Sequence, residues 1–305
     1  MFSALRRIYH SLPVIRELKH ISREQQYALD KVADLERLKR KLQIDKYRRQ
    51  LLSQERYENP RKLNRYEAQV FSQNGEDGII AEIFSRIGVQ SKTFLEIGVE
   101  AGLENNSVFL LFQDWSGIWI EGDEEAVERI RQHFNKPIAE ERLRVVQSFV
   151  TAENVERVLQ DTKIQDDLDL ASFDIDRNTY WIWAALPRLN ARVVVAEYNG
   201  AIPPGIDWKV DYDPSRLWDG TTHFGASLKA FELLGRQYGY CLVGCDLNGV
   251  NAFFVRQDLC DGKFAEPFTS EYHFEPFRPF LIQRMGYPPS FGDTILTPQG
   301  NREQQ

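Results

Sequence analysis

The stretch KTFLEIGVEAG (92–102) decides the fold, because residues 92–98 form a compact apolar strand that ends in glycine. Strand-like and helix-like segments alternate after it. Further strands are expected at 117–123, 143–149, 170–176, 191–199, 240–246 and 251–258, and helices at 105–113, 124–134, 153–160, 179–189 and 226–239. The apolar runs are too continuous for a half-exposed sheet, so this alternation predicts an α/β fold with a mostly parallel sheet covered on both faces. The last two strands, joined by Leu247-Asn248-Gly249, predict a terminal hairpin.

Charge divides the 305 residues unevenly. Residues 1–60 carry 14 lysines and arginines against 8 aspartates and glutamates, whereas the remaining residues carry 24 against 37. An acidic body argues against nucleic acid as a partner, because phosphate binding needs a basic face. The three cysteines, Cys241, Cys245 and Cys260, form neither a disulfide framework nor a four-ligand zinc site, and reduced thiols in a cytoplasmic protein are expected.

The basic arm, residues 1–60, is expected to be helical and coiled-coil-like. A heptad seam with steps of three and four runs through Leu18, Ile21, Gln25, Ala28, Val32, Leu35, Lys39 and Leu42. Such a seam predicts a homo-oligomer, and packing of the helix on its own domain is the alternative. A sharper alternative is a weak peripheral contact with the inner face of the membrane. The side chains that would face lipid are Phe2, Leu5, Ile8 and Tyr9, and those that would meet anionic headgroups are Arg6, Arg7, Arg16 and Lys19.

The turn after the first strand predicts a cofactor site. Gly98 and Gly102 allow a tight turn and a close approach to the backbone, although a plain strand–helix turn has the same pattern. Glu121, at the end of the second strand, is spaced as a carboxylate that binds ribose hydroxyls. Glu100 and Glu104 disfavour a phosphate at this turn. A cofactor with a ribose, no phosphate and a positive sulfonium fits these residues, which indicates S-adenosylmethionine (SAM).

Several segments in order resemble the FkbM-like family of SAM-dependent methyltransferases over about residues 66–258. They are SQNGEDGIIAEIF (72–84), FLEIGVEAGLENNSVFLL (94–111), DWSGIWIEGD (114–123), SFDIDRNTYWIW (172–183), VVVAEYN (193–199), GASL (225–228) and GVNAFFVR (249–256). The resemblance implies a Rossmann-like class I methyltransferase fold, with a seven-stranded, mostly parallel sheet and an antiparallel last strand. The arm lies outside it, as does an irregular, aromatic and proline-rich tail, 259–305, that is expected to pack on the domain.

The resemblance also implies the residues that bind the cofactor. Glu96, Gly98 and Gly102 would form the SAM loop, and Glu121 would hold the ribose. The segment 72–77 would close over the methionine end, with Gln73, Gly75, Glu76 and Asp77 in contact. Asn105 and Asn106 would bind cofactor or form an N-cap pair without a ligand. Ser148 and Phe149 would meet the adenine or form a buried core pair.

Polar side chains at the ends of the fourth and fifth strands carry the expected chemistry. Asp174 with Asp176, and Glu197 with Asn199, are two residues apart, so each pair shares a face. These oxygen ligands suit Mg²⁺ or Mn²⁺, and the arrangement is similar to catechol O-methyltransferase, whose metal ligands lie at these strand ends. Alternatively, Asp174 contacts the SAM amino group and Glu197 orients a helix.

His223 precedes the helix at 226–239 and is expected to act as a general base or as a substrate contact. The family more often has tyrosine at this position. The loop 200–224 also holds Trp208, Tyr212 and Trp218, which would pack against a sugar ring or fill the core.

The sequence therefore predicts a SAM-dependent O-methyltransferase in which Asp174, Glu197 and His223 are catalytic, with or without a divalent metal. By resemblance, the acceptor would be the hydroxyl of a sugar in a surface glycan or natural product. A non-catalytic, glycan-binding adaptor built on the same domain is the alternative.

Overall fold

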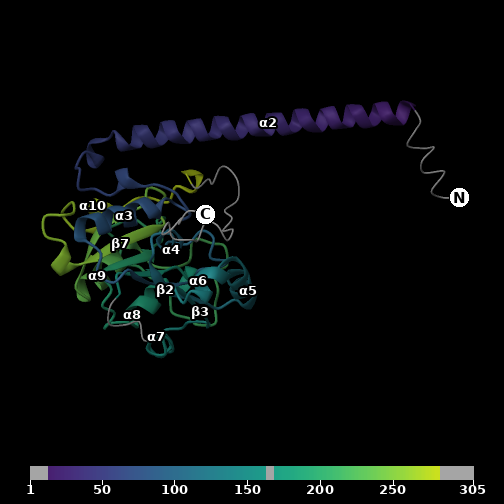
Figure 1. Ribbon diagram of the computed structural model, residues 1–305. Coiled ribbons are helices and arrows are strands. Elements are labelled where there is room, and N and C mark those ends of the chain that lie inside the picture. The colour runs from purple at the N-terminus through teal and green to yellow at the C-terminus, as the bar shows by residue number, and fades with distance from the viewer. Residues whose placement is uncertain (1–12, 163–167, 282–305) are drawn as a thin grey trace, which may run out of the picture. The chain divides into compact units, whose positions relative to one another are not determined.

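The computed structural model describes residues 13–162 and 168–281, without the side chains of residues 14 and 16. The chain forms two units, Met1–Ser53 and Gln54–Gln305, and each is considered by itself. The described part of the first unit contains one long helix, α2 (Pro13–Leu52; Figure 1). The predicted helical arm is therefore confirmed over its described residues, and the helix ends before Pro60.

The heptad seam of α2 faces solvent within this unit. Leu18, Ile21, Val32, Leu35 and Leu42 are between 44% and 65% exposed. Residues 2–9, on which the predicted membrane contact depends, lie outside the described residues. No helix in the described ranges is both long enough and apolar enough to span a membrane.

The second unit is built on a seven-stranded sheet with the order β3-β2-β1-β4-β5-β7-β6. The strands are β1 (Thr93–Ile97), β2 (Ser116–Glu121), β3 (Leu143–Gln147), β4 (Leu170–Phe173), β5 (Val193–Glu197), β6 (Tyr240–Cys245) and β7 (Asn251–Arg256). All pairings are parallel except those of β7, which runs antiparallel to both β5 and β6. This topology confirms the predicted Rossmann-like class I methyltransferase fold, with its seven strands and antiparallel last strand.

Helices cover both faces of the sheet (Figure 1). One buried cluster joins Phe94 and Trp119 to α3 (Glu76–Ile87), α4 (Val108–Leu111) and α5 (Glu124–His133). A second cluster joins Leu95 and Ile120 to α7 (Val155–Gln160), α8 (Thr179–Ala184) and α9 (Leu228–Gln237). Neighbouring strand residues point to opposite faces, so each strand serves both clusters.

Side-chain caps set the starts of two of these helices. The Asp123 carboxylate accepts from the backbone N–H of Ala126 at 2.7 Å, and the Ser227 hydroxyl accepts from that of Ala230 at 3.1 Å. The shorter helices are α6 (Asn135–Ala139), α10 (Ser270–His273), η1 (Glu55–Tyr57), η2 (Asn64–Tyr66), η3 (Asp176–Asn178), η4 (Gln257–Leu259) and η5 (Pro279–Leu281). Cys241, Cys245 and Cys260 are free thiols.

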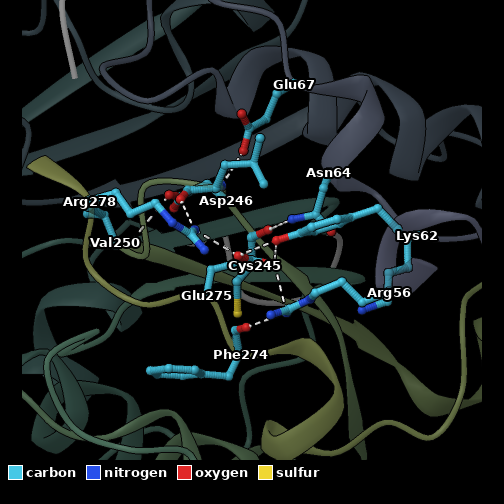
Figure 2. A network of polar contacts seen from close by, with 12 residues as sticks. Arg56, Lys62, Asn64, Glu67, Cys245, Asp246, Val250, Phe274, Glu275 and Arg278 are labelled. Atoms are coloured by element: carbon cyan, nitrogen blue, oxygen red, sulfur yellow. Dashed lines mark hydrogen bonds and ion pairs between the residues drawn. The ribbon is translucent and has the colours of Figure 1, made fainter. Parts of the chain in front are cut away.

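Residues 54–60 differ from the prediction, because they belong to the second unit rather than to the arm. Glu275 explains this placement (Figure 2). Its buried carboxylate accepts from the Tyr57 hydroxyl at 2.8 and 2.9 Å and from the Arg56 guanidinium at 3.0 Å. A buried carboxylate must be paired, so these contacts tie the first residues after α2 to the C-terminal segment.

The same carboxylate connects the C-terminal segment to the turn before β7. Arg278 donates to Glu275 at 2.8 Å and to the carbonyl of Leu247 at 2.6 Å. Asn248 in turn donates to the Asn74 side chain at 3.2 Å. The described part of the tail, through residue 281, therefore contacts the rest of the domain through a buried ionic network. Residues 282–305 lie outside the described ranges.

Candidate functional site

A cavity of about 810 Å³ lies at the carboxyl ends of β1, β2, β3 and β4 and at the start of β7. Strand β1 pairs with β2 on one side and with β4 on the other. The chain runs outward from β1 through β2 to β3 and then returns to β4 on the other side of β1, so the strand order reverses between β1 and β4, which is the switch point where open α/β sheets bind ligands. The cavity thus occupies the place that the sequence predicted for the cofactor.

Gly98 forms the turn that borders the cavity. Its φ is +81°, and a Cβ atom there would lie 1.7 Å from the carbonyl oxygen of Asp174. No side chain fits such an approach. Glu121 holds the same turn, because its carboxylate accepts from the backbone N–H groups of Val99 at 3.0 Å and Glu100 at 2.8 Å. Gly98 and Glu121 both line the cavity, whereas Gly102 lies against the Trp119 ring outside it.

Glu96 lies beneath the cavity lining. It is 1% exposed, and its carboxylate accepts four hydrogen bonds, from Asn105 Nδ2, from Asn106 N and from Ser107 N and Oγ. Burial raises the pKa of Glu96, and these hydrogen bonds act in the opposite direction. The residue shapes the wall formed by 105–107, and the lining does not include it.

Asn105 and Asn106 both line the cavity. The N-cap of α4 is Ser107, without a side-chain capping bond, so the alternative that these asparagines form an N-cap pair is wrong. Asn106 donates to the Ser172 hydroxyl at 3.0 Å.

The segment 72–77 is only partly at the cavity. Gln73 and Glu76 line it, whereas Gly75 and Asp77 do not. The Asp77 carboxylate accepts from the backbone N–H groups of residues 70, 71 and 72 at 2.7–2.9 Å, so it orders the preceding turn. Its expected contact with cofactor is therefore replaced by a structural role.

Ser148 and Phe149 line the far side of the cavity, next to Glu121. The backbone N–H of Ser148 donates to the carbonyl of Glu121 at 2.9 Å. Phe149 is 54% exposed, so the alternative of a buried core pair is wrong. An exposed aromatic ring on a cavity wall offers a stacking face to a flat ligand.

Three carboxylates meet at the ends of β4 and β5. Asp174 and Asp176 line the cavity, and Glu197, which is outside the lining, lies near both of them. Burial, followed by the neighbouring Asp176 carboxylate, raises the pKa of Asp174 to about 7. Burial and Asp174 raise the pKa of Glu197 well above its ordinary value. Asp174 is thus poised to exchange a proton near neutral pH.

The predicted metal site is not assembled. Asn199 is 1% exposed, and its amide donates to the carbonyls of Thr222 at 2.8 Å and Phe224 at 3.0 Å. Asn199 therefore secures the loop 222–224 and does not turn toward Asp174. Across residues 13–162 and 168–281, no three His, Cys, Asp or Glu side chains are arranged to hold a metal ion. The set of Asp174, Asp176, Glu197 and Asn199 as metal ligands is therefore a correction to the prediction.

His223 is exposed and is not part of the cavity lining. Its ring lies edge-on to Trp208, with the centroids 5.6 Å apart. The Tyr212 hydroxyl donates to Glu153 at 2.6 Å, away from the lining. Trp218, of the three aromatic residues predicted to meet a sugar ring, lines the cavity and is 48% exposed. The structure therefore does not bring His223 into the cavity lining.

No family model matches the chain, and no curated protein matches it. A SAM-dependent methyltransferase from Aquifex aeolicus is similar at 13% identity over 57% of this chain and 87% of that chain (TM-score 0.32). A spermidine synthase from Thermotoga maritima is similar at 15% identity over 64% of this chain and 63% of that chain (TM-score 0.36). The FkbM-like resemblance stays a prediction.

Several lining residues were not predicted from the sequence. Asn251, at the start of β7, is the cross-strand partner of Glu197 and donates to Glu76 at 2.7 Å. The hairpin predicted at 240–258 could have indicated the position of Asn251. An antiparallel last strand starts at the edge of the sheet where the parallel strands end, so its first residue lies near the predicted site. The others are Asn74, Ile97, Val99, Ala101, Leu103, Ile120, Gly122, Asp123, Val150, Ile175, Arg177, Asn178, Arg216 and Leu217.

The raised pKa of Asp174 predicts a pH dependence of stability. Between its ordinary value of 3.8 and its folded value of about 7, the folded protein binds the proton that the unfolded chain releases. The contribution of Asp174 to the free energy of unfolding should therefore decrease as the pH rises through this interval. Urea unfolding at several pH values should show a smaller decrease in Asp174→Asn than in the wild type. Equal slopes would contradict this prediction, and Glu104→Gln, an exposed charge loss, is the control.

Proposed function

We propose that this chain is a SAM-dependent methyltransferase whose acceptor is a hydroxyl group. The observation that carries the proposal is the position of the Gly98 turn and of Glu121 on one wall of the switch-point cavity. The turn exposes backbone to the cavity, and Glu121 Oε1, which accepts one hydrogen bond, from the Asp123 N–H at 2.9 Å, can also accept from a ribose hydroxyl. Among the described residues that line the cavity there is no lysine, and the two arginines are Arg177 and Arg216, which favours a cofactor without phosphate.

The cavity offers a contact for each part of this cofactor. Gly98 and Val99 present backbone, Glu121 presents acceptor oxygens, and the exposed ring of Phe149 presents a flat apolar face. When bound, SAM supplies an electrophilic methyl group. The residues of this chain orient the two substrates and accept the proton that the acceptor loses.

Asp174 is the candidate proton acceptor. It lines the cavity beside the Gly98 turn, and a pKa of about 7 gives it substantial basic strength while part of the population is ionised at neutral pH. Glu197, which lies near it, can share the proton that arrives. The resemblance to the FkbM-like family favours a sugar of a glycan or natural product as the acceptor, and the exposed Trp218 ring on the rim suits such a ligand.

Replacing Glu121 with alanine is expected to weaken SAM binding by about 1.5–3 kcal/mol, the scale of hydrogen bonds to a charged group. Isothermal titration with SAM measures this loss. The variant also loses two bonds to the Gly98 turn, so Glu121→Gln, which keeps the side-chain length, should bind with intermediate affinity.

Glu104→Gln is the matched control, because it removes a charge from the exposed rim of the same cavity and should leave SAM affinity unchanged. Wild-type affinity in a folded Glu121→Ala variant would refute the assignment of the ribose contact. SAM binding without turnover on any glycan would instead support the non-catalytic adaptor.

We also propose that α2 mediates self-association. Its seam is exposed in the unit, and a wide apolar stripe on a 40-residue helix is typical of a coiled coil. Gln25 and Lys39 interrupt the seam, and polar residues at such positions restrict the number of strands.

The double variant Leu35→Glu/Leu42→Glu is expected to dissociate the oligomer, because it places four charges in the seam of each dimer. Light scattering on the full chain gives the mass per particle. Ala33→Glu, which adds a charge outside the seam, should leave that mass unchanged. A wild-type mass in the double variant would exclude the seam as the contact.

A further inference from the structure

Two acceptor oxygens at the ends of β5 and β7 lack a hydrogen-bond donor. They are Glu197 Oε2 and Asn251 Oδ1, and both are buried and accept no hydrogen bond from a described residue. Asn251 is 2% exposed and lines the cavity. Its Nδ2 donates to Glu76 Oε1 at 2.7 Å, so the amide orientation is set and Oδ1 is the atom left over. Unpaired buried acceptors are costly, which indicates a ligand that donates to them.

The two acceptors belong to neighbouring side chains. Glu197 and Asn251 are directly opposite in the antiparallel pair of β5 and β7. Side chains at such positions lie on the same face, with Cβ atoms about 4.5–5.5 Å apart. A small group with several N–H bonds can therefore reach both oxygens at once.

The charge of the surroundings decides what this group is. The cavity lining contains seven carboxylates, of Glu76, Glu100, Glu104, Glu121, Asp123, Asp174 and Asp176, against two arginines. The Arg177 guanidinium donates to the carbonyls of residues 223 and 211, each at 3.3 Å. The Arg216 guanidinium lies 3.5 Å from Asp219. Both arginines have partners outside the carboxylate cluster, so a cation from the ligand would balance it.

We propose that Glu197 and Asn251 form a subsite for a ligand ammonium group, next to Asp174. An ammonium has three donors, no acceptor and a positive charge, which matches two unpaired acceptors, Asn251 Oδ1 in the acidic cavity lining and Glu197 Oε2 on the paired strand beside it. The ammonium can come from the methyl acceptor or from the amino-acid part of the cofactor, and in either case the inference rests on the proposed methyltransferase function. In the first case the acceptor is a hydroxyl compound that carries an amine.

This subsite also fits the assigned role of Asp174. Glu197 lies near Asp174, so a cation held by Glu197 is close to both carboxyls. A positive charge at that distance favours the ionised form of Asp174. Asp174 is then ready to accept the proton of the hydroxyl group.

Sugar probes of matched shape test the acceptor source. Glucosamine carries an ammonium at neutral pH, whereas N-acetylglucosamine and glucose do not. Titration of the full chain, with and without S-adenosylhomocysteine, should show at least about tenfold tighter binding of glucosamine. Glu197→Gln and Asn251→Leu should each remove this preference, and Glu128→Gln, an exposed charge loss outside the cavity lining, should keep it. Thermal unfolding identifies any variant that fails to fold. In that case Asp174→Asn, next to the proposed subsite, is titrated with the same sugars instead.

A second pair of probes tests the cofactor source. S-adenosylhomocysteine has an α-ammonium, whereas methylthioadenosine lacks the amino-acid part. If the ammonium is that of the cofactor, Glu197→Gln weakens the binding of S-adenosylhomocysteine by at least about tenfold. The same variant leaves the affinities for methylthioadenosine and for the sugars unchanged.

Equal binding of charged and neutral sugars by the wild type, together with unchanged S-adenosylhomocysteine affinity in Glu197→Gln, would overturn the subsite. A wild-type chain that binds neither adenosyl compound would refute the proposed methyltransferase. The glucosamine preference, measured without cofactor, would then still test the ammonium subsite.

Discussion

Replacing Gly98 with alanine is expected to lower the free energy of unfolding by more than about 4 kcal/mol, in the range of exceptional core defects. Two effects combine at this position. The residue has a φ of +81°, which costs an alanine about 1–2 kcal/mol. The added Cβ would also lie 1.7 Å from the carbonyl oxygen of Asp174, so the ends of β1 and β4 would have to separate.

The consequence for function is as large as that for stability, because the same turn borders the cavity and holds Asp174 in place. Urea unfolding gives the stability, and titration with SAM gives the affinity of whatever folded fraction remains. Loss of SAM binding is expected.

Gly205→Ala is the matched control for this substitution. No atom lies within 4 Å of the position of its Cβ, and its φ is outside the left-handed region. Alanine there restricts the unfolded chain without a clash, so a stability change between zero and a gain of about 1 kcal/mol is expected. If the free energy of unfolding of Gly98→Ala lies within about 1 kcal/mol of the wild-type value, the close approach of Gly98 to Asp174 is not needed for stability.

Replacing Glu275 with alanine is expected to cost about 3–5 kcal/mol of stability, the range for breaking a buried ion pair. Its carboxylate is fully buried and is bonded to the Tyr57 hydroxyl, Arg56 and Arg278. Removing it leaves the Arg278 guanidinium, which is 8% exposed, without its carboxylate. The network of Figure 2 would lose its centre, and residues 54–57 would lose their main polar anchor.

Chemical denaturation of the full chain measures this cost. The control is Asp207→Ala, which breaks the pair between Lys209 and Asp207 at 3.3 Å, where both side chains are about one-third exposed or more. Solvent screens such a pair, so a loss of less than about 1 kcal/mol is expected. Similar losses in Asp207→Ala and Glu275→Ala would show that the buried network is not a major source of stability.

The sequence by itself determined the elements and their class. The apolar run at 92–98, the β-branched run at 191–199 and the turn at 247–249 each specify a strand or hairpin locally, and all are present. Asp123 begins α5 because a short acceptor side chain caps the next N–H groups, which is a local interaction. The location of the cavity followed as well, because parallel strands that alternate with helices bring their carboxyl ends to one edge.

Only the tertiary structure decided which polar side chains face the cavity. Glu96 and Asn199 carry the same groups as the residues that line the cavity. Both are buried, so their polar atoms must form hydrogen bonds nearby: Glu96 bonds to residues 105–107, and Asn199 bonds to the backbone at 222–224. Asn251 reaches the site through its pairing with Glu197, a contact between residues far apart in the chain. Glu275 likewise draws residues 54–57 into the domain. Hydrogen-bond partners depend on distances between distant segments, and no local pattern in the sequence encodes those distances.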